Sequence, residues 1–210
     1  YPNMGDDGIC AGGVYKKLYD DGMKKSPLES LYLGPKVSND KLKGMLQKYH
    51  VTKPKNILPH VVRLLAKKNA IALVQGRAEF GPRALGNRSI IISPKSVDLV
   101  ASLNRRLGRS EFMPFAPIIV SDLADQCLLD YSKSHFSARH MVTTYGVTKE
   151  FRDNSPAVVH VDNTVRPQVV FKSDNPFLYD LLNAWHHETG GMCLINTSFN
   201  LHEDPIASIE

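Results

Sequence analysis

Two segments of the chain carry apolar residues at helical spacing. The pattern over residues 57–65 predicts a helix, and Lys67 and Lys68 suit its C-terminal end, where cations interact favourably with the helix dipole. Residues 175–189 form a second amphipathic pattern. Asn175 is a good first residue for that helix, and the two glycines that follow the pattern are typical of a helix end.

Short apolar and β-branched runs predict strands around these helices. The expected strands cover residues 70–74, 90–92, 115–120, 141–147, 158–161, 168–171 and 192–195, and further helices are expected over 97–107 and from near Asp122. The two kinds of element alternate irregularly, and no internal repeat is visible. This order predicts an α+β fold with a mixed sheet.

The beginning of the chain follows another pattern. Residues 1–24 predict a turn, with a loop over 5–8, followed by a helix. Residues 25–55 are rich in Lys, Pro, Ser and Gly and predict a linker, so that the main domain is expected over 56–210. Because the chain opens on Tyr1 and stops just after a turn-like segment, we expect it to be part of a longer protein.

Composition excludes several classes of protein. Of the 210 residues, 42% are hydrophobic and 22% are charged, which is normal for a globular domain and argues against disorder, collagen and coiled coil. The longest apolar runs are far below the ~20 residues of a membrane-spanning helix, so no membrane segment is expected. Cys10, Cys127 and Cys193 are widely scattered and odd in number, which favours a reducing compartment and a cytoplasmic location.

The positive charge of the chain is concentrated in one stretch. Residues 77–109 hold seven basic and two acidic residues, a surplus that equals the net charge of +5 of the whole chain. Six of the seven bases are arginine, whose planar fork matches phosphate and carboxylate oxygens. A solvated basic surface is the alternative.

The most specific motif is the segment 75–89, which follows a predicted strand. Its glycines let the backbone approach a ligand, and Arg77, Arg83 and Arg88 could surround an anion with charge-assisted hydrogen bonds. Asn87 and Ser89 are further candidates for phosphate binding. The alternative is a structural network in which Glu79 pairs with an arginine.

Three other places hold candidate polar residues. A predicted helix end delivers Arg109 towards a strand, although Arg105 and Arg106 beside it suit a basic helix C-terminus. His160 and Asp162 are expected on one face of a strand, where a satisfied core histidine is the alternative. Polar residues directly after the last buried strand suit a site at the carboxyl end of a sheet, with a simple polar turn as the alternative: Asn196, Thr197, Ser198 and Asn200.

Taken in order, these motifs resemble the NodU/CmcH-type O-carbamoyltransferases over nearly the whole chain. The segments that carry the resemblance are 76–89, 113–117, 159–162 and 196–200. The resemblance implies a C-terminal domain of YrdC-like fold, a twisted mixed sheet flanked by helices, that makes carbamoyl adenylate from carbamoyl phosphate and ATP. It also implies that residues 1–24 are the tail of an actin-like ATPase-type domain, which transfers the carbamoyl group to a hydroxyl acceptor.

The resemblance also implies roles for single residues. Ser198 and Asn200 match a Ser-x-Asn motif that holds nucleotide phosphates. Arg109 matches the arginine of a Lys-x-Arg motif, and Leu107 occupies the lysine position of that motif here. The four arginines at 77, 83, 88 and 109 would clamp phosphates, and His160 would orient the carbamoyl group. We expect these four arginines, Ser198 and Asn200 to converge on one concave site.

ATP is the implied nucleotide, accompanied by Mg²⁺. Asp6 matches one ligand of an iron or other divalent metal site whose remaining ligands belong to the upstream domain. One carboxylate is too few to hold a metal, so this segment alone is not expected to carbamoylate an acceptor. The identity of the acceptor stays open. The oligomeric state stays open as well, with a homo-oligomer as one possibility.

Two rival functions follow from the same residues. The basic surplus and a YrdC-like fold would also suit an RNA-binding module, but aromatic residues make up only 8% of the chain and do not interleave with the arginines. An interaction domain with a structural arginine network is the third possibility. Stabilisation by ATP or carbamoyl phosphate separates the enzyme from both.

Overall fold

A computed structural model describes residues 6–24, 28–36, 43–44, 46–95, 101–102, 104–105, 115–131 and 135–199 of the chain. Within them a five-stranded sheet has the order β1-β2-β7-β3-β6. Strands β3 and β6 pair in parallel, whereas the other neighbours are antiparallel, so the predicted α+β fold with a mixed sheet is confirmed. The strands are Ile71–Val74 (β1), Arg88–Ile92 (β2), Ala116–Val120 (β3), Gln168–Val170 (β6) and Leu194–Thr197 (β7).

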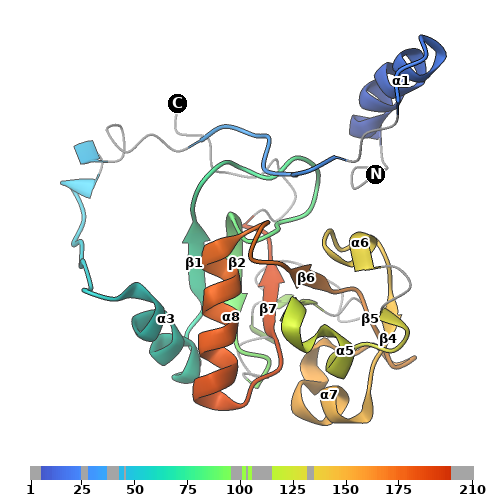
Figure 1. The fold of residues 1–210 in the computed structure, drawn as a ribbon. Coiled ribbons are helices and arrows are strands. Elements are labelled where there is room, and N and C mark those ends of the chain that lie inside the picture. Colours follow the sequence, from blue (N-terminus) through green and yellow to red (C-terminus); the bar gives the residue numbers. More distant parts are fainter. Residues whose placement is uncertain are drawn as a thin grey trace.

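Two helices cover one face of this sheet, α3 (Ile57–Ala66) and α8 (Pro176–Thr189), and they lie beside each other (Figure 1). The Asn175 side chain accepts a hydrogen bond from the Leu178 N–H, as a capping residue does at a helix start. Gly190 ends α8 in the left-handed conformation at φ 67°, which costs glycine little. Both ends of α8 therefore lie where the sequence predicts them.

Smaller elements lie beside the β6 side of the sheet (Figure 1). They are the 3-10 turns η1 (Ser121–Leu123) and η3 (Pro156–Val158), the helices α5 (Ala124–Cys127), α6 (His135–Ala138) and α7 (Lys149–Asn154), and the paired strands β4 (Tyr145–Gly146) and β5 (Thr164–Val165). The strand predicted over 158–161 is wrong, because the chain leaves η3 and turns at 160–163 before β5. The predicted strand 141–147 is present only as the two residues of β4.

The hydrophobic core lies between the sheet and the helices. Trp185 of α8, Leu65 of α3 and Ile118 of β3 are all almost completely buried. Helix α1 (Asp6–Asp20) contributes little to this core, since Ile9 and Tyr19 on it are 69% and 59% exposed. Its first turn includes residues 6–8, so the loop predicted there is wrong.

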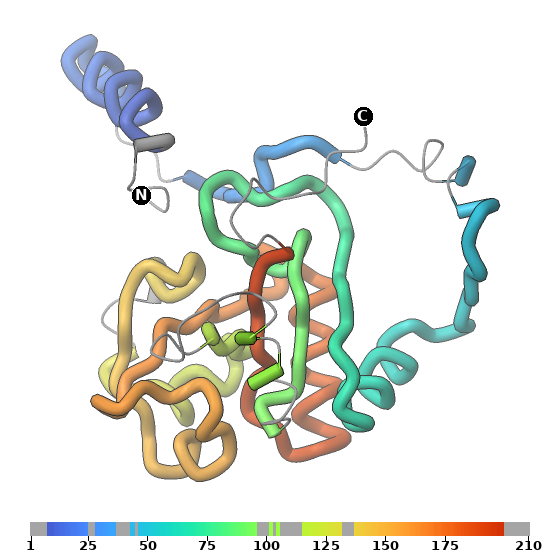
Figure 2. Tube along the Cα trace, turned by 180° about the vertical axis from the view of Figure 1, so that it is seen from behind, coloured from blue at the N-terminus to red at the C-terminus, as the bar shows by residue number. Residues whose placement is uncertain are grey.

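Residues 28–36, which we call the strap, run across the connection between β1 and β2 (Figures 1 and 2). Leu31 is 3% exposed, and Lys36 forms an antiparallel bridge with Arg77. This part of the predicted linker 25–55 is therefore packed on the main fold. None of the helices in the described ranges is long and apolar enough to cross a membrane. The predicted domain boundaries stay a prediction.

Candidate functional site

The candidate site is built on residues 75–87, the basic loop, which joins the antiparallel strands β1 and β2. Gly76, Gly81 and Gly86 in it have φ of 51°, 107° and 102°, values that side chains other than glycine rarely adopt. At Gly86 an added Cβ would also overlap the Leu178 side chain of α8. The glycines of the motif therefore shape the turn and let it pack on α8.

Glu79 holds the basic loop in its curved shape. Its Oε1 accepts hydrogen bonds from the backbone N–H groups of Leu85 (2.8 Å), Asn87 (2.8 Å) and Arg88 (3.0 Å). In the described residues, this carboxylate binds backbone N–H groups rather than an arginine. The alternative in which Glu79 pairs with an arginine is not seen among the described residues.

Arg88 points inward from the base of the loop. It is 2% exposed, and its guanidinium donates to the carbonyl oxygens of Gln75 (2.7 Å) and Asn87 (2.9 Å). A longer contact of 3.4 Å reaches Gly76 O. A guanidinium has five N–H donors in a fixed fork, so one side chain can tie several carbonyls together. Arg88 therefore holds the two ends of the loop together.

Asn87 and Ser89 also form hydrogen bonds within the protein. Asn87 Nδ2 donates to Arg77 O at 2.8 Å, and Asn87 Oδ1 accepts from Asn175 Nδ2 at 3.0 Å. Ser89 Oγ accepts from the Gly86 N–H at 2.9 Å and is completely buried. The loop is thus fastened to the cap of α8.

Asn196 extends this buried network to the last strand. Its Nδ2 donates to Ala84 O (2.9 Å) and to Gln168 Oε1 (3.0 Å), and Gln168 Nε2 donates to Leu85 O (2.7 Å). Strands β6 and β7 therefore both contribute side chains that hydrogen-bond to the loop. Three residues that the sequence suggests as phosphate ligands, Asn87, Ser89 and Asn196, are engaged inside the fold.

Arg77 and Arg83, in contrast, are exposed residues of the loop. Arg77 Nη2 donates to Leu33 O of the strap at 2.7 Å, which ties this guanidinium to the strap. Among the described residues, Arg83 has no hydrogen-bond or ion-pair partner. These two arginines are the groups of the motif that remain open to an anion.

The end of β7 lies at the same edge of the sheet as the basic loop. Strand β7 runs antiparallel to β2, and Thr197 pairs with Ile90, the central residue of β2. Thr197 is 7% exposed and Ser198, which follows it, is half-buried. The register therefore brings the Ser198 turn next to the base of the loop. Arg109 and Asn200, the other members of the expected site, lie outside the described residues.

His160 occupies a turn rather than a strand. The N–H of Asn163 donates to His160 O at 2.9 Å, and Asn163 has φ of 61°, a conformation that asparagine tolerates. Asp162 Oδ1 accepts from Thr164, which lowers the pKa of this exposed carboxyl group. The turn leads into β5, on the far side of the sheet from β1 (Figure 1). The structure does not bring His160 together with the basic loop.

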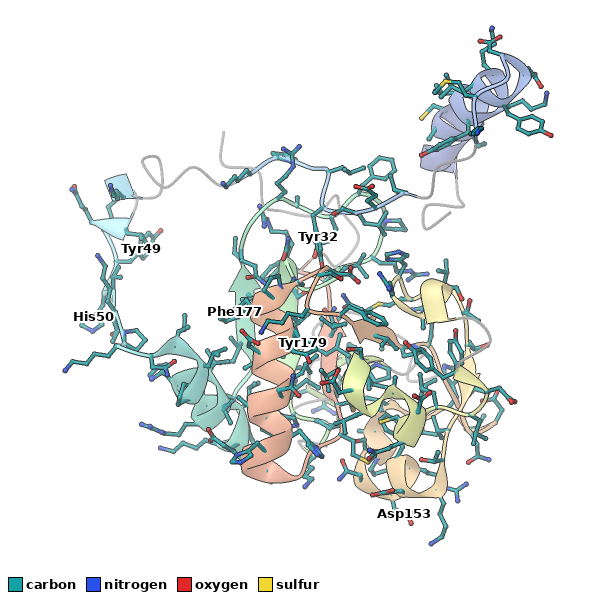
Figure 3. All side chains as sticks on the ribbon, viewed as in Figure 1. Tyr32, Tyr49, His50, Asp153, Phe177 and Tyr179 are labelled. Atoms are coloured by element: carbon teal, nitrogen blue, oxygen red, sulfur yellow. The ribbon has the colours of Figure 1, made fainter. Side chains whose placement is uncertain are left out.

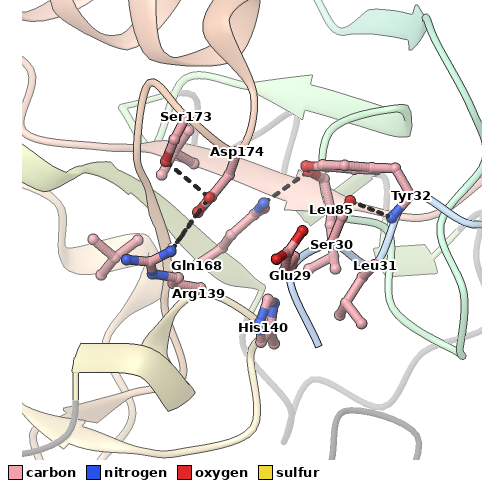
Figure 4. A pocket seen from close by; sticks show the side chains of 12 residues that line it. Glu29, Ser30, Leu31, Tyr32, Leu85, Arg139, His140, Gln168, Ser173 and Asp174 are labelled. Carbon is pink, nitrogen blue, oxygen red and sulfur yellow. Dashed lines mark hydrogen bonds and ion pairs between the residues drawn. The ribbon is translucent and has the colours of Figure 1, made fainter. Parts of the chain in front are cut away.

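A small pocket that the sequence did not indicate lies under the strap (Figure 4). Its volume is about 60 Å³, far below the 300–1,000 Å³ of typical ligand pockets. Arg139 pairs with Asp174 at 3.3 Å inside it, and burial lowers the pKa of His140 there. Because Glu29 and Asp174 both line it, the pocket does not favour an anion.

The amino-acid sequence as a whole identifies the family. The family described as "Carbamoyltransferase C-terminus" matches residues 62–210. The chain belongs to this family. The resemblance found in the motifs is confirmed.

Two curated relatives illustrate the range of this family. An uncharacterised protein of Methanocaldococcus jannaschii is 37% identical over 96% of this chain and 34% of its own length. The nodulation protein NolNO of Sinorhizobium fredii is 31% identical over 95% of this chain and 31% of its own length. The chain therefore spans about a third of the length of these two relatives.

Among solved structures, full-length HypF in its phosphate- and nucleotide-bound form aligns with a TM-score of 0.47 and 16% sequence identity. The alignment covers 73% of this chain and 22% of the HypF chain. A similarity at this level does not support assigning roles to single residues of this chain.

The described residues hold no group of three His, Cys, Asp or Glu side chains that could bind a metal ion. The side chain of Asp6, the expected remnant of an upstream metal site, lies outside the described residues.

Proposed function

We propose that this chain is the part of an O-carbamoyltransferase that forms carbamoyl adenylate from carbamoyl phosphate and ATP. The observation that carries the proposal is the basic loop, which presents Arg77 and Arg83 to solvent while its own hydrogen bonds fix its shape. Membership of the carbamoyltransferase C-terminus family supports the same substrate class. A YrdC-like arrangement of the sheet belongs to this proposal.

The reaction brings two polyanions together. For its atoms to balance, water releases inorganic phosphate from carbamoyl phosphate, and the resulting carbamate displaces pyrophosphate from the α-phosphorus of ATP. Both steps need positive charge that offsets the repulsion and stabilises the charge of the transition state. Guanidinium groups on a loop of fixed shape provide this charge without rearrangement.

The exposed arginines are the residues that we assign to the substrates. Arg77 and Arg83 would bind phosphate oxygens through paired N–H groups, as guanidinium forks do. Ser198 would donate a neutral hydrogen bond to a phosphate, together with Arg109 and Asn200 of the family motifs. Mg²⁺, when bound with ATP, would neutralise part of the phosphate charge.

The buried residues have a different role in this proposal. Arg88, Asn87 and Asn196 would act as positioning residues, because each of their side chains donates to protein carbonyls. The orienting role of His160 stays a proposal from the family motif. Transfer to a hydroxyl acceptor would require a domain corresponding to the part of its relatives that this chain does not span.

The test is carbamoyl-phosphate-dependent exchange of labelled pyrophosphate into ATP by the full chain. We expect exchange with carbamoyl phosphate and none with acetyl phosphate, because acetyl phosphate cannot supply carbamate. A chain that shows no exchange and is not stabilised thermally by ATP or carbamoyl phosphate contradicts the proposal. Binding of RNA with a steep salt dependence would instead favour the nucleic-acid module.

A further inference from the structure

The strap, residues 28–36, forms backbone hydrogen bonds with the basic loop. The Gly34 N–H donates to Ala78 O (2.9 Å), and the Ala78 N–H donates back to Pro35 O (2.9 Å). A third bond of 2.7 Å joins the Phe80 N–H to Leu31 O. Figures 1 and 2 show the blue strap crossing the green loop from both sides. The outer backbone of the loop is therefore paired with a segment that lies far away in the sequence.

The strap approaches the loop most closely at Gly34. A Cβ added to Gly34 would lie 2.8 Å from Ala78 Cβ and 3.0 Å from Ala78 O. These distances are shorter than van der Waals contact, and backbone atoms on the loop cannot rotate away. Any larger residue at position 34 would push the strap and the loop apart. The close pairing thus depends on a glycine.

Carbonyl groups of the strap also bind the arginines of the loop. Leu33 O accepts from Arg77 Nη2 at 2.7 Å, and Pro35 O lies 3.5 Å from Arg88 Nη2. The first contact fixes the direction of an arginine that we assign to phosphate binding. The strap therefore acts on a side chain of the site as well as on its backbone.

Tyr32 connects the strap to the buried network. Its hydroxyl donates to Leu85 O at 2.8 Å and accepts from Asn175 Nδ2 at 3.3 Å. Burial raises the pKa of Tyr32, so that the phenol stays neutral and keeps the proton that it donates. Tyr32 lies over the first turn of α8 (Figure 3). One hydroxyl group thus joins the strap, the basic loop and the helix cap.

We propose that the strap positions the basic loop for anion binding, and that Gly34 and Tyr32 are positioning residues for the phosphate site. This inference rests on the proposed function for its ligand, carbamoyl phosphate. The strap precedes residues 62–210, the part that the family description covers. A displacement of the chain upstream of the loop would thereby change affinity at the loop.

The first experiment compares Gly34→Ala with Gly13→Ala in the full chain. Gly13 lies in α1, and an added Cβ there meets no atom within 4 Å. Amide hydrogen exchange is measured at Ala78 and Phe80, whose N–H groups the strap binds. In Gly34→Ala we expect exchange at both amides about tenfold faster or more, because the strap opens locally. Gly13→Ala should match the unsubstituted chain.

The second measurement is the affinity of the same variants for carbamoyl phosphate by calorimetry. Gly34→Ala should bind about tenfold more weakly at an unchanged melting temperature of the main fold. Tyr32→Phe, which keeps the ring and loses both hydrogen bonds of the hydroxyl group, should bind about threefold to tenfold more weakly. Faster exchange with unchanged affinity would overturn the positioning role.

The two arms separate this inference from the proposed function. If the unsubstituted chain binds no carbamoyl phosphate, the proposed function fails, while the exchange of Ala78 and Phe80 still tests the strap. Unchanged exchange at both amides in Gly34→Ala would overturn the strap itself. The double substitution Gly34→Ala with Ala78→Gly removes the contact between the two Cβ atoms, and we expect it to recover part of the lost protection.

Discussion

The buried, inner side chains of the basic loop and its exposed, outer side chains both include arginine, and the two sets differ in what they bind. On the inner side, Glu79 and Arg88 hold backbone groups of the loop, and Arg88 is almost completely buried. On the outer side, Arg77 and Arg83 are exposed. An arginine in a glycine-rich motif can therefore shape a site without touching its ligand.

Burial explains this division. A charged group that leaves water costs several kcal/mol unless hydrogen bonds replace its hydration. Arg88 meets this condition through the carbonyl oxygens around it, whereas Arg83 keeps its hydration until an anion binds. The inner residues should then affect stability and the outer residues activity.

The largest effect is expected for Arg88→Ala. Two short hydrogen bonds to a charged group are lost, and the carbonyls of Gln75 and Asn87 are left buried. We expect the free energy of unfolding to fall by about 3–5 kcal/mol in urea titrations. Arg63→Ala on the exposed side of α3 is the control and should change it by less than about 0.5 kcal/mol. Equal effects of the two substitutions would contradict an internal role for Arg88.

Glu79 provides the next comparison. Glu79→Ala removes the acceptor of three backbone N–H groups, and we expect a loss of about 2–3 kcal/mol in the free energy of unfolding. Glu79→Gln keeps a carbonyl oxygen and should lose about 1 kcal/mol. The exposed Glu188→Gln serves as the control in the same urea titrations. If Gln were as damaging as Ala, the hydrogen-bond account would be wrong.

Arg83 should behave in the opposite way. Arg83→Lys keeps the charge and loses the fork, so pyrophosphate exchange should fall about tenfold to a hundredfold, nearly as far as in Arg83→Ala. The melting temperature of both variants should stay unchanged, since Arg83 has no partner among the described residues. A lysine variant with normal exchange would remove Arg83 from the site.

The smallest effect concerns pH and the pocket under the strap. Burial lowers the pKa of His140, opposed by Asp174 and aided by Arg139. The unfolded chain then binds more protons than the folded one below pH ~6.5, so stability is retained above that pH and falls as pH decreases towards the folded pKa. The free energy of unfolding should be smaller at pH 5.5 than at pH 7.5. His140→Gln should weaken this dependence, whereas the exposed His187→Gln should preserve it.

Elements with local signals could be predicted from the sequence. Helix α8 begins and ends at residues whose side chains or φ angles favour helix ends, Asn175 and Gly190. The turn at 160–163 could not be predicted, because β-branched neighbours suggest a strand and the turn depends on the left-handed Asn163. The prediction followed the β-branched sequence pattern, which carries no information about the backbone conformation of Asn163.

The division of labour within the basic loop could not be predicted either. Nothing in the spacing of Arg77, Arg83 and Arg88 distinguishes them, since burial depends on β6, β7 and α8, which come later in the chain. The strap was missed for a related reason. Its apolar residues, Leu31 and Tyr32 among them, form a short cluster inside a polar segment, and only long-range pairing with the loop gives them a role.

The side-chain Nε–H signals of the arginines, followed by NMR during a titration with carbamoyl phosphate, test the central claim most directly. The account predicts saturable shifts of the Arg77 and Arg83 signals and a nearly constant Arg88 signal, because Arg88 remains bound to protein carbonyls. A saturable shift confined to Arg88, or no shift of Arg77 and Arg83 at concentrations that support pyrophosphate exchange, would contradict it.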